Sequence, residues 1–321
     1  MSEQLQNSHK MDKVKVGISA CLLGHKVRFD GGHKRSHFCA EALAEYVEYQ
    51  TFCPEVAVGL PVPRPTIRQI DRGGIIHVST PDGSSDVTTL LNEYGEQVAS
   101  SIDSLSAFIF TAKSPSCGME RVKVWQHDGK GSKSDGIGLF AAKIMTLCPN
   151  LPCEESGRLN DPVIRENFIL RMYAYHKWQS LLSGGMTKHK LVQFHSQYKY
   201  TLMSHQLVSY RQLGRLVASA EKDIDQLAQQ YIKLFMQTLK IKSNRKTHTT
   251  TLQHVQGYFS RYLESYERVE LTKQVHAYRL GIVPLLVPLT LLRHYLLKYP
   301  NPYLSQQTYF HPYPEALRLL G

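Results

Sequence analysis

The sequence changes character near residue 160, and this change limits the folds that the chain can adopt. Upstream, short strand patterns alternate with helical patterns. The predicted strands are residues 13–20, 49–53 and 107–112, and the predicted helices are residues 39–49, 86–104 and 139–145. Downstream of Asp161 the pattern is helical almost throughout. We therefore predict an α/β N-terminal domain with a mostly parallel, Rossmann-like sheet, followed by an all-α C-terminal domain.

A chain of 321 residues exceeds the usual size of one domain, so two domains are expected. Residues 1–12 are polar and predict a flexible tail, residues 13–155 form the first domain, and residues 162–321 form the second. The boundary is acidic and turn-forming, and Asp161 is placed to cap a helix that Pro162 opens. The further predicted helices are residues 187–204, 210–218, 221–239, 246–262, 264–280 and 290–298, before a loop-like tail.

The net charge of +11 is unevenly divided between the two domains. Residues 1–160 carry 17 Lys and Arg against 18 Asp and Glu, whereas residues 161–321 carry 21 against 9. A basic domain joined to a nearly neutral one indicates a module that binds a polyanion, of which nucleic acid is the commonest. The alternative is a generically basic surface.

The composition predicts a cytoplasmic protein that does not enter a membrane. The polar N-terminus lacks the apolar core of a signal peptide, and the most apolar stretch, residues 280–297, is interrupted by Pro284, Pro288 and Arg293. In the reducing cytoplasm the six cysteines are not expected to form disulfides. No Cys-x-x-Cys pair occurs, so metal binding at other spacings or simple burial must account for them.

Three of the six cysteines follow predicted strands. Cys21 comes after the first strand, Cys53 after the second, and Cys117 after residues 107–112. Ligands of open parallel sheets bind beyond the carboxyl ends of the strands, so these thiols are expected to converge. They suit either zinc with a fourth ligand or three corners of a 4Fe-4S cluster with one open iron. Cys39, Cys148 and Cys153 lack this setting and are interpreted as structural.

Polar residues beside these cysteines are candidates for catalysis. An open iron is a Lewis acid with affinity for sulfur, which favours a sulfur-bearing substrate. Glu55 is placed to move protons, and the hydroxyls of Ser114 and Ser116 to orient substrate or water. The glycine-containing segment of residues 128–138 is interpreted as a polar loop.

Five motifs together resemble the thiouracil desulfidase family, in order, over about the first 155 residues. They are Ser19-Ala20-Cys21-Leu22-Leu23-Gly24, Val27-Arg28-Phe29-Asp30-Gly31, Cys53-Pro54-Glu55, Gly59-Leu60-Pro61-Val62-Pro63-Arg64 and Lys113-Ser114-Pro115-Ser116-Cys117-Gly118. The resemblance implies that the three cysteines bind a 4Fe-4S cluster, whose free iron takes the sulfur of a thiolated pyrimidine in a transient 4Fe-5S state without net redox. Water then replaces the sulfur and hydrosulfide leaves.

The resemblance also implies roles for individual residues. Cys21, Cys53 and Cys117 become cluster ligands, Glu55 becomes the acid or base, and Ser114 or Ser116 holds the pyrimidine. Asp30 is a candidate for contacting the base, with a turn-forming Asp-Gly pair as the alternative. Phe29 stands where the family motif leads us to expect tyrosine, which weakens any role for a hydroxyl there.

The second half resembles a helical domain found fused behind desulfidase domains. The similar segments include Leu191-Val192-Gln193-Phe194-His195, Arg211-Gln212-Leu213-Gly214-Arg215 and Gln253-His254-Val255-Gln256-Gly257-Tyr258. In such fusions the resemblance implies action on 4-thiouridine in tRNA. The basic residues that we expect to contact RNA are Lys188, Lys190, Lys199, Arg211, Arg215, Lys242, Arg245 and Lys246. Tyrosines beside basic residues are candidates for stacking on unpaired bases, although tyrosines more often lie in the core.

The sequence thus predicts an iron-sulfur desulfidase that converts 4-thiouridine in tRNA to the oxygen form, with free thiouracil or thiouridine as further substrates. One alternative is a desulfidase of free thiouracil alone, in which the helical domain serves dimerisation. Another is an RNA-binding regulator without enzymatic activity, whose cluster is structural or acts as a sensor.

Overall fold

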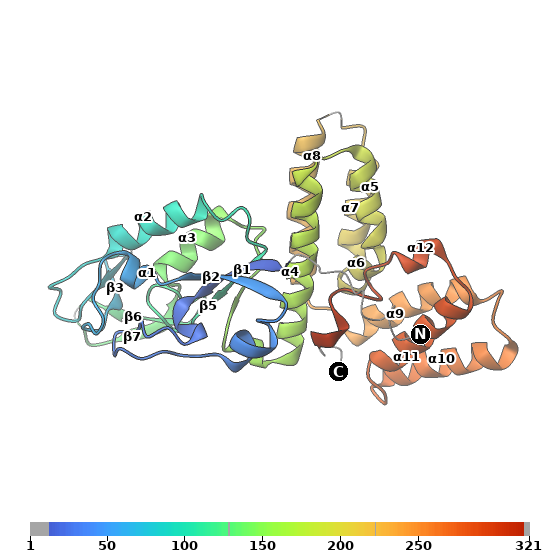
Figure 1. Ribbon diagram of the computed structural model, residues 1–321, viewed down its shortest axis with the longest axis horizontal. Helices are drawn as coiled ribbons and strands as arrows, with labels where there is room; N and C mark the ends of the chain where they lie inside the picture. Colours follow the sequence, from blue (N-terminus) through green and yellow to red (C-terminus); the bar gives the residue numbers. More distant parts are fainter. Residues whose placement is uncertain (1–12, 128, 222, 318–321) are drawn as a thin grey trace. The chain divides into compact units, whose positions relative to one another are not determined.

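The chain divides into two compact units, residues 1–160 and residues 161–321. The computed structural model describes residues 13–127, 129–221 and 223–317 (Figure 1). The predicted tail of residues 1–12 lies outside this range. The first unit combines strands with helices and the second is helical, so the predicted fold class is confirmed.

The first unit contains two four-stranded sheets. Its strands are β1 (Val14–Ser19), β2 (Val47–Phe52), β3 (Arg68–Arg72), β4 (Ile75–Ser79), β5 (Ala107–Phe110), β6 (Val122–Gln126), β7 (Ser132–Gly136) and β8 (Cys153–Glu155). Its α-helices are α1 (Pro54–Ala57), α2 (Thr88–Ala99) and α3 (Leu139–Leu147).

The main sheet has the strand order β2-β1-β5-β8 and is parallel throughout. All four residues of β5 are buried, as expected of a parallel strand covered on both faces. Phe108 and Phe110 stack on each other and meet the ring of Phe140 from α3 edge-on. The helices α2 and α3 lie side by side in Figure 1, and this aromatic cluster fixes α3 against the sheet.

The second sheet, with the order β4-β3-β6-β7, is mixed and was not expected from the sequence. Its strands come from the two long connections that leave the carboxyl ends of β2 and β5. The strand β7 falls within the predicted loop of residues 128–138, so that prediction is wrong for residues 132–136. Its side chains are polar and mostly exposed, and only antiparallel pairing with β6 makes it a strand.

The helix predicted for residues 39–49 is also wrong over its second half. Helical turns occur only at Phe38–Ala42, and Val47 begins β2. Val47 and Tyr49 pair with Val14 and Val16 of β1, so inter-strand hydrogen bonding overrides the local helical spacing.

The second sheet holds the loop that contains Cys117. The Gln69 side-chain amide of β3 donates to the carbonyls of Pro115 and Ile137, at 3.0 and 2.6 Å. Gly138 lies against the same loop, because a Cβ atom there would be 2.5 Å from the Ser116 carbonyl carbon and oxygen. The predicted loop therefore contributes a close backbone contact that only glycine allows.

The second unit is built from nine α-helices within its described residues. They are α4 (Pro162–Ser183), α5 (Lys188–Gln197), α6 (Lys199–His205), α7 (Leu207–Val217), α8 (Ile224–Lys240), α9 (Arg245–Gln256), α10 (Ser265–Leu280), α11 (Leu286–Lys298) and α12 (Pro302–Ser305). Asp161 caps α4 by accepting from the backbone N–H groups of Val163 and Ile164, as its sequence position indicates. No helix in the described ranges is both long and apolar enough to cross a bilayer.

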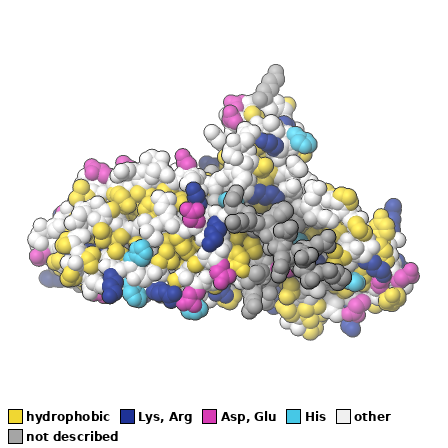
Figure 2. Space-filling view, viewed as in Figure 1, with side chains coloured by type: hydrophobic (Ala, Val, Ile, Leu, Met, Phe, Trp, Pro, Cys, Tyr) yellow, Lys and Arg dark blue, Asp and Glu magenta, His cyan; other side chains and the backbone are white. Residues whose placement is uncertain are grey.

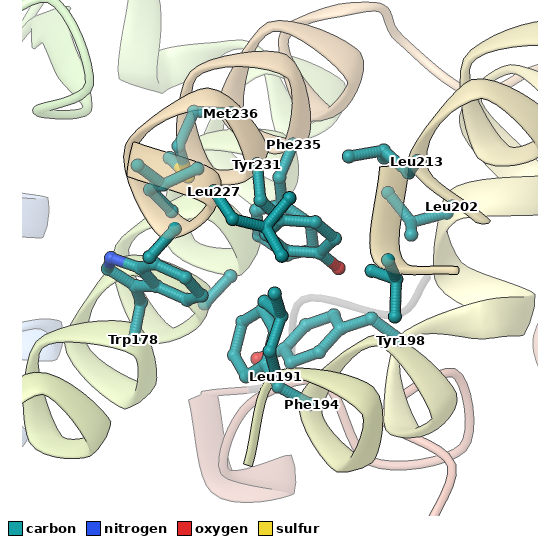
Figure 3. Close-up of a cluster of buried hydrophobic side chains, with 14 of the residues drawn as sticks. Trp178, Leu191, Phe194, Tyr198, Leu202, Leu213, Leu227, Tyr231, Phe235 and Met236 are labelled. Carbon is teal, nitrogen blue, oxygen red and sulfur yellow. The ribbon is translucent and has the colours of Figure 1, made fainter. Parts of the chain in front are cut away.

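Two hydrophobic clusters stabilise the second unit, and α6 contributes to both. Leu202 joins a cluster formed by α4, α5, α7 and α8, in which the rings of Trp178, Phe194 and Tyr231 face one another (Figure 3). Tyr200 and Met203 join the other, with α9, α10 and α11. The predicted loop-like tail also supplies buried side chains to this second cluster, among them Phe310.

We predict that Gly138→Ala destabilises the first unit by roughly 1–3 kcal/mol, because the added methyl group overlaps the Ser116 backbone. Urea unfolding followed by circular dichroism measures this change. The matched control is Gly157→Ala, since a Cβ there would meet no described atom within 4 Å. Equal midpoints for both variants would contradict the close contact.

Candidate active site

Three cysteine side chains meet at one edge of the main sheet. Cys21 lies in the helical turn directly after β1, Cys53 follows β2 and precedes α1, and Cys117 lies in the loop after β5. The strands β2, β1 and β5 are adjacent and parallel, so their carboxyl ends open on the same side. All three thiols line a single cavity of about 360 Å³.

Burial raises the pKa of all three thiols, most strongly that of Cys117. Cys21 and Cys53 raise the pKa of Cys117 further, so the three sulfur atoms are close enough to repel one another when ionised. The Thr111 hydroxyl lies beside Cys21 and lowers the pKa of that thiol, and no described nitrogen or oxygen atom pairs with this hydroxyl. Three ionised thiols that are buried and close together are stable only when a strongly positive group lies beside them.

The three cysteines supply the type of ligand that both iron-sulfur clusters and zinc use. Among the described residues, no three His, Cys, Asp or Glu side chains are grouped so as to hold one metal ion. Three zinc ligands must all lie about 2.3 Å from one centre, whereas an iron-sulfur cube is held by thiolates on separate irons. No histidine is found among the described residues that line the cavity.

Glu55 is held between two groups beside the cysteines. It lies in the first turn of α1, and its Oε1 accepts a hydrogen bond from the Ser116 hydroxyl at 2.6 Å. Its Oε2 accepts from Arg64 Nη2 at 2.6 Å and from Nε at 3.2 Å. The carboxylate lines the cavity together with Arg64, and Ser116 supports it from outside the lining.

Arg64 is the main site residue that sequence reasoning missed. Its side chain is only 3% exposed, and its remaining donors reach the carbonyls of Pro61 and Val27. The guanidinium thus joins three segments, and Glu55 is the acid that balances its charge. The signal was present, since Arg64 ends the Gly-Leu-Pro-Val-Pro-Arg motif, but nothing in the sequence marked it as buried.

Ser114 and Ser116 have different positions. Ser114 lines the cavity, and its Oγ accepts from the backbone N–H groups of Ser116 and Cys117, at 3.2 and 3.1 Å. Ser116 is fully buried behind Glu55 and does not line the cavity. Both hydroxyls donate to Glu55 Oε1, Ser116 at 2.6 Å and Ser114 at 3.4 Å, but only Ser114 also faces the cavity.

Asp30 lies outside the cavity lining. Its carboxylate accepts from the Gly32 backbone N–H at 3.0 Å, which lowers its pKa, and forms an ion pair with Arg28. This is the turn-forming role that was the alternative for an Asp-Gly pair. Phe29 does line the cavity and is 38% exposed.

Three cations that sequence analysis left without a role also line the cavity: Arg28, Lys34 and Lys113. Lys34 and Lys113 leave the lining electropositive, since Glu55 is paired with Arg64 and Asp30 with Arg28. The other three cysteines lie elsewhere. Cys39 is fully buried, Cys148 donates to the Ala99 carbonyl, and Cys153 belongs to β8.

The eight basic residues predicted to bind RNA divide by environment. Lys188 donates to the Ser219 carbonyl, and Lys190 donates to the carbonyls of Gly184 and Gly185 that end α4. Lys199 lies over the rings of Tyr200 and Tyr303. These three side chains have structural contacts of their own.

The remaining five predicted RNA contacts are exposed and lack ion-pair partners among the described residues. They are Arg211 and Arg215 on α7, and Lys242, Arg245 and Lys246 around the turn between α8 and α9. On the face shown in Figure 2, Lys and Arg side chains are scattered rather than gathered in one patch. Many tyrosines of this unit, such as Tyr198 and Tyr231, are buried in its cores.

Comparison with known proteins agrees with the geometry of the first unit. The model of the 2-thiouracil desulfurase family matches residues 16–156, which include the three cavity cysteines, Glu55 and Arg64. The chain belongs to the 2-thiouracil desulfurase family. This match ends four residues before the first unit does, and a family described as "Protein of unknown function (DUF1722)" matches residues 199–314.

Two individual proteins are also similar to this chain. The Escherichia coli (strain K12) protein named Uncharacterized protein YbgA is 35% identical over 156 residues, which are 48% of this chain and 92% of YbgA. A solved structure named [4Fe-4S]-dependent thiouracil desulfidase TudS is 30% identical, with a TM-score of 0.38, and the match covers 49% of this chain and 100% of TudS.

We predict that Arg64→Gln destabilises the first unit by about 3 kcal/mol, because it leaves the Glu55 carboxylate partly buried without its counter-charge. The control is Arg35→Gln, which removes an exposed ion pair with Glu41 and should cost no more than about 1 kcal/mol. Urea unfolding measures the free energy of unfolding of both variants. Equal losses in the two variants would show that Arg64 has no special role in the fold.

Proposed function

We propose that this protein is a desulfidase that replaces the sulfur of a thiolated pyrimidine with oxygen and releases hydrosulfide. The observation that carries the proposal is the convergence of three thiols, two of them buried and one half-buried, on a cavity that also contains an oriented carboxylate. Each thiol follows one of three adjacent parallel strands. The family match gives the same reaction class.

Cys21, Cys53 and Cys117 would hold a 4Fe-4S cluster, the group that the sequence resemblance implies. When bound, such a cluster supplies an open iron that acts as a Lewis acid toward the sulfur of the substrate. No histidine or fourth cysteine belongs to the described lining of the cavity, which is consistent with an iron that has no protein ligand.

The residues of the chain provide the proton transfer and the positioning. A water molecule adds to the ring carbon that bears sulfur, Glu55 accepts a proton from it, and the carbon–sulfur bond breaks. The second proton of the water passes to sulfur, so the ring keeps the oxygen as a carbonyl and sulfur leaves as hydrosulfide without any change in oxidation state. Arg64 and Ser116 keep Glu55 aimed at the cavity, and the Ser114 hydroxyl is placed to contact the pyrimidine.

We further propose that the physiological substrate is 4-thiouridine in tRNA. The excess of 21 basic over 9 acidic residues in 161–321 supports this, as do the five exposed cations around α7 and the start of α9. The electropositive lining of the catalytic cavity suits a substrate with phosphate groups better than a neutral free base.

We predict that Glu55→Gln lowers turnover at least 100-fold while the iron content stays unchanged, because the variant cannot accept a proton. Cys53→Ser should instead lose iron and sulfide. Anaerobic purification with iron and sulfide analysis, and a turnover assay on 4-thiouridine, measure both effects. Glu48→Gln and Cys148→Ser are controls, since neither residue lines the cavity.

Each alternative has its own outcome in this assay. Zinc in place of about four irons per chain would exclude the cluster mechanism. Full function in Glu55→Gln would favour an RNA-binding regulator whose cluster is structural or a sensor. Turnover of free thiouracil without turnover of thiolated tRNA would favour the desulfidase of free bases.

We predict that tRNA binding weakens steeply as salt rises, and that Arg211→Gln combined with Arg215→Gln lowers the salt slope by about two. These side chains lie four residues apart on the exposed face of α7. Fluorescence anisotropy at several salt concentrations measures the slope. The control is Lys273→Gln on α10, whose side chain lies near Glu270, and salt-independent binding would contradict an RNA role for this unit.

A further inference from the structure

The second unit contains a cavity of its own, which the desulfidase reaction does not use. Its volume is about 360 Å³, at the small end of the roughly 300–1,000 Å³ of ligand pockets and larger than one inorganic phosphate requires. Side chains from α4, α6, α9, α10 and α11 line it. It lies within residues 161–321 and therefore within a single unit.

One end of this cavity is positive. The helix α9 begins there, and its Asn244 cap accepts the N–H of Thr247, so earlier N–H groups of the first turn have no acceptor within the helix. Arg245 lines the cavity and has no ion-pair partner among the described residues. Its guanidinium lies over Gly281 at the end of α10, where a Cβ atom would be 2.8 Å from Nη1.

Two buried side chains present polar atoms that lack partners. Tyr278 is 5% exposed and lines the cavity, and its hydroxyl makes no hydrogen bond with a described residue. His205 is 4% exposed, and its Nδ1 donates to the Ile241 carbonyl at 2.5 Å. A carbonyl can only accept, so Nδ1 carries the proton and Nε2 is an acceptor without a partner in the described chain.

The remaining polar groups of the lining are already engaged. The two ring nitrogens of His248 lie 2.9 Å from the Tyr309 hydroxyl and 2.9 Å from Ser243 Oγ. Glu166, an acid in this lining, accepts from the Tyr313 hydroxyl at 2.9 Å. The rings of Tyr278 and His248 meet edge-on and, with Leu289, provide apolar surface for a planar group.

From this arrangement we propose that the cavity binds a mononucleotide, with the phosphate at Arg245 and the start of α9 and the base edge at Tyr278 and His205. The phosphate is assigned to Arg245 because this cation lines the cavity and has no ion-pair partner among the described residues. The Tyr278 hydroxyl can donate a hydrogen bond and His205 Nε2 can accept one. This pair matches the edge of a base that carries both an acceptor and an N–H donor. The ligand is either a free nucleotide or the phosphorylated terminal nucleotide of an RNA, and the proposal does not depend on the reaction at the cysteine cavity.

Isothermal titration of the full chain with uridine 5′-monophosphate tests this site. We expect Arg245→Gln to weaken affinity at least tenfold and Tyr278→Phe about fivefold, because each removes one hydrogen bond to the ligand while the ring packing is kept. Lys273→Gln, which changes an exposed residue of α10 outside the cavity lining, should change affinity less than twofold. Binding at the cysteine cavity is recognised because it survives Arg245→Gln.

Further titrations separate the two sources of the ligand. Binding of the free nucleotide supports a small-molecule effector. Binding only of an RNA oligonucleotide with a 5′-phosphate, and not of the same oligonucleotide without it, supports a terminal nucleotide. The proposal fails if neither ligand binds, if Arg245→Gln and Tyr278→Phe both bind as the wild type does, or if inorganic phosphate binds as tightly as the nucleotide.

Discussion

The parallel pairing of β2, β1 and β5 is the constraint on which the catalytic cavity depends. Cys21, Cys53 and Cys117 are separated by up to 96 positions in the chain, and no local structure brings them together. Adjacent parallel strands end at the same edge of a sheet, so each cysteine needs only to follow its own strand. The rings of Phe108 and Phe110 on β5 pack against Phe140 of α3, and this packing stabilises the sheet that carries this edge.

The buried ion pair between Glu55 and Arg64 places an oriented carboxylate at this edge of the sheet. An arginine that is only 3% exposed is costly to bury, and its pairing with Glu55 and with two carbonyls offsets that cost. The same contact fixes the carboxylate beside the thiols. One group of hydrogen bonds therefore contributes both to stability and to the orientation of the Glu55 carboxylate. Ser116 belongs to this group and is buried, whereas Ser114 faces the cavity.

The second unit combines two hydrophobic clusters with polar groups that have no partner among the described residues. Its helix α6 contributes to both hydrophobic clusters and also lines the cavity through His205. Several predicted RNA contacts, such as Lys188 and Lys190, are instead occupied by backbone carbonyls. Part of the basic charge of this unit thus binds backbone carbonyls near helix ends, and exposed cations are available to a polyanion.

The sequence by itself determined the fold class, the positions of the main strands and the uneven charge, because these follow from local periodicity and composition. It also placed each of the three cysteines after a strand. The tertiary structure alone decided that residues 132–136 form β7 and that residues 47–49 belong to β2, since pairing with β6 and β1 overrides local preference. It also decided that Arg64 is buried against Glu55, and that Tyr278 and His205 face one cavity. Those relations join residues far apart in the chain, and only long-range packing sets the distances between them.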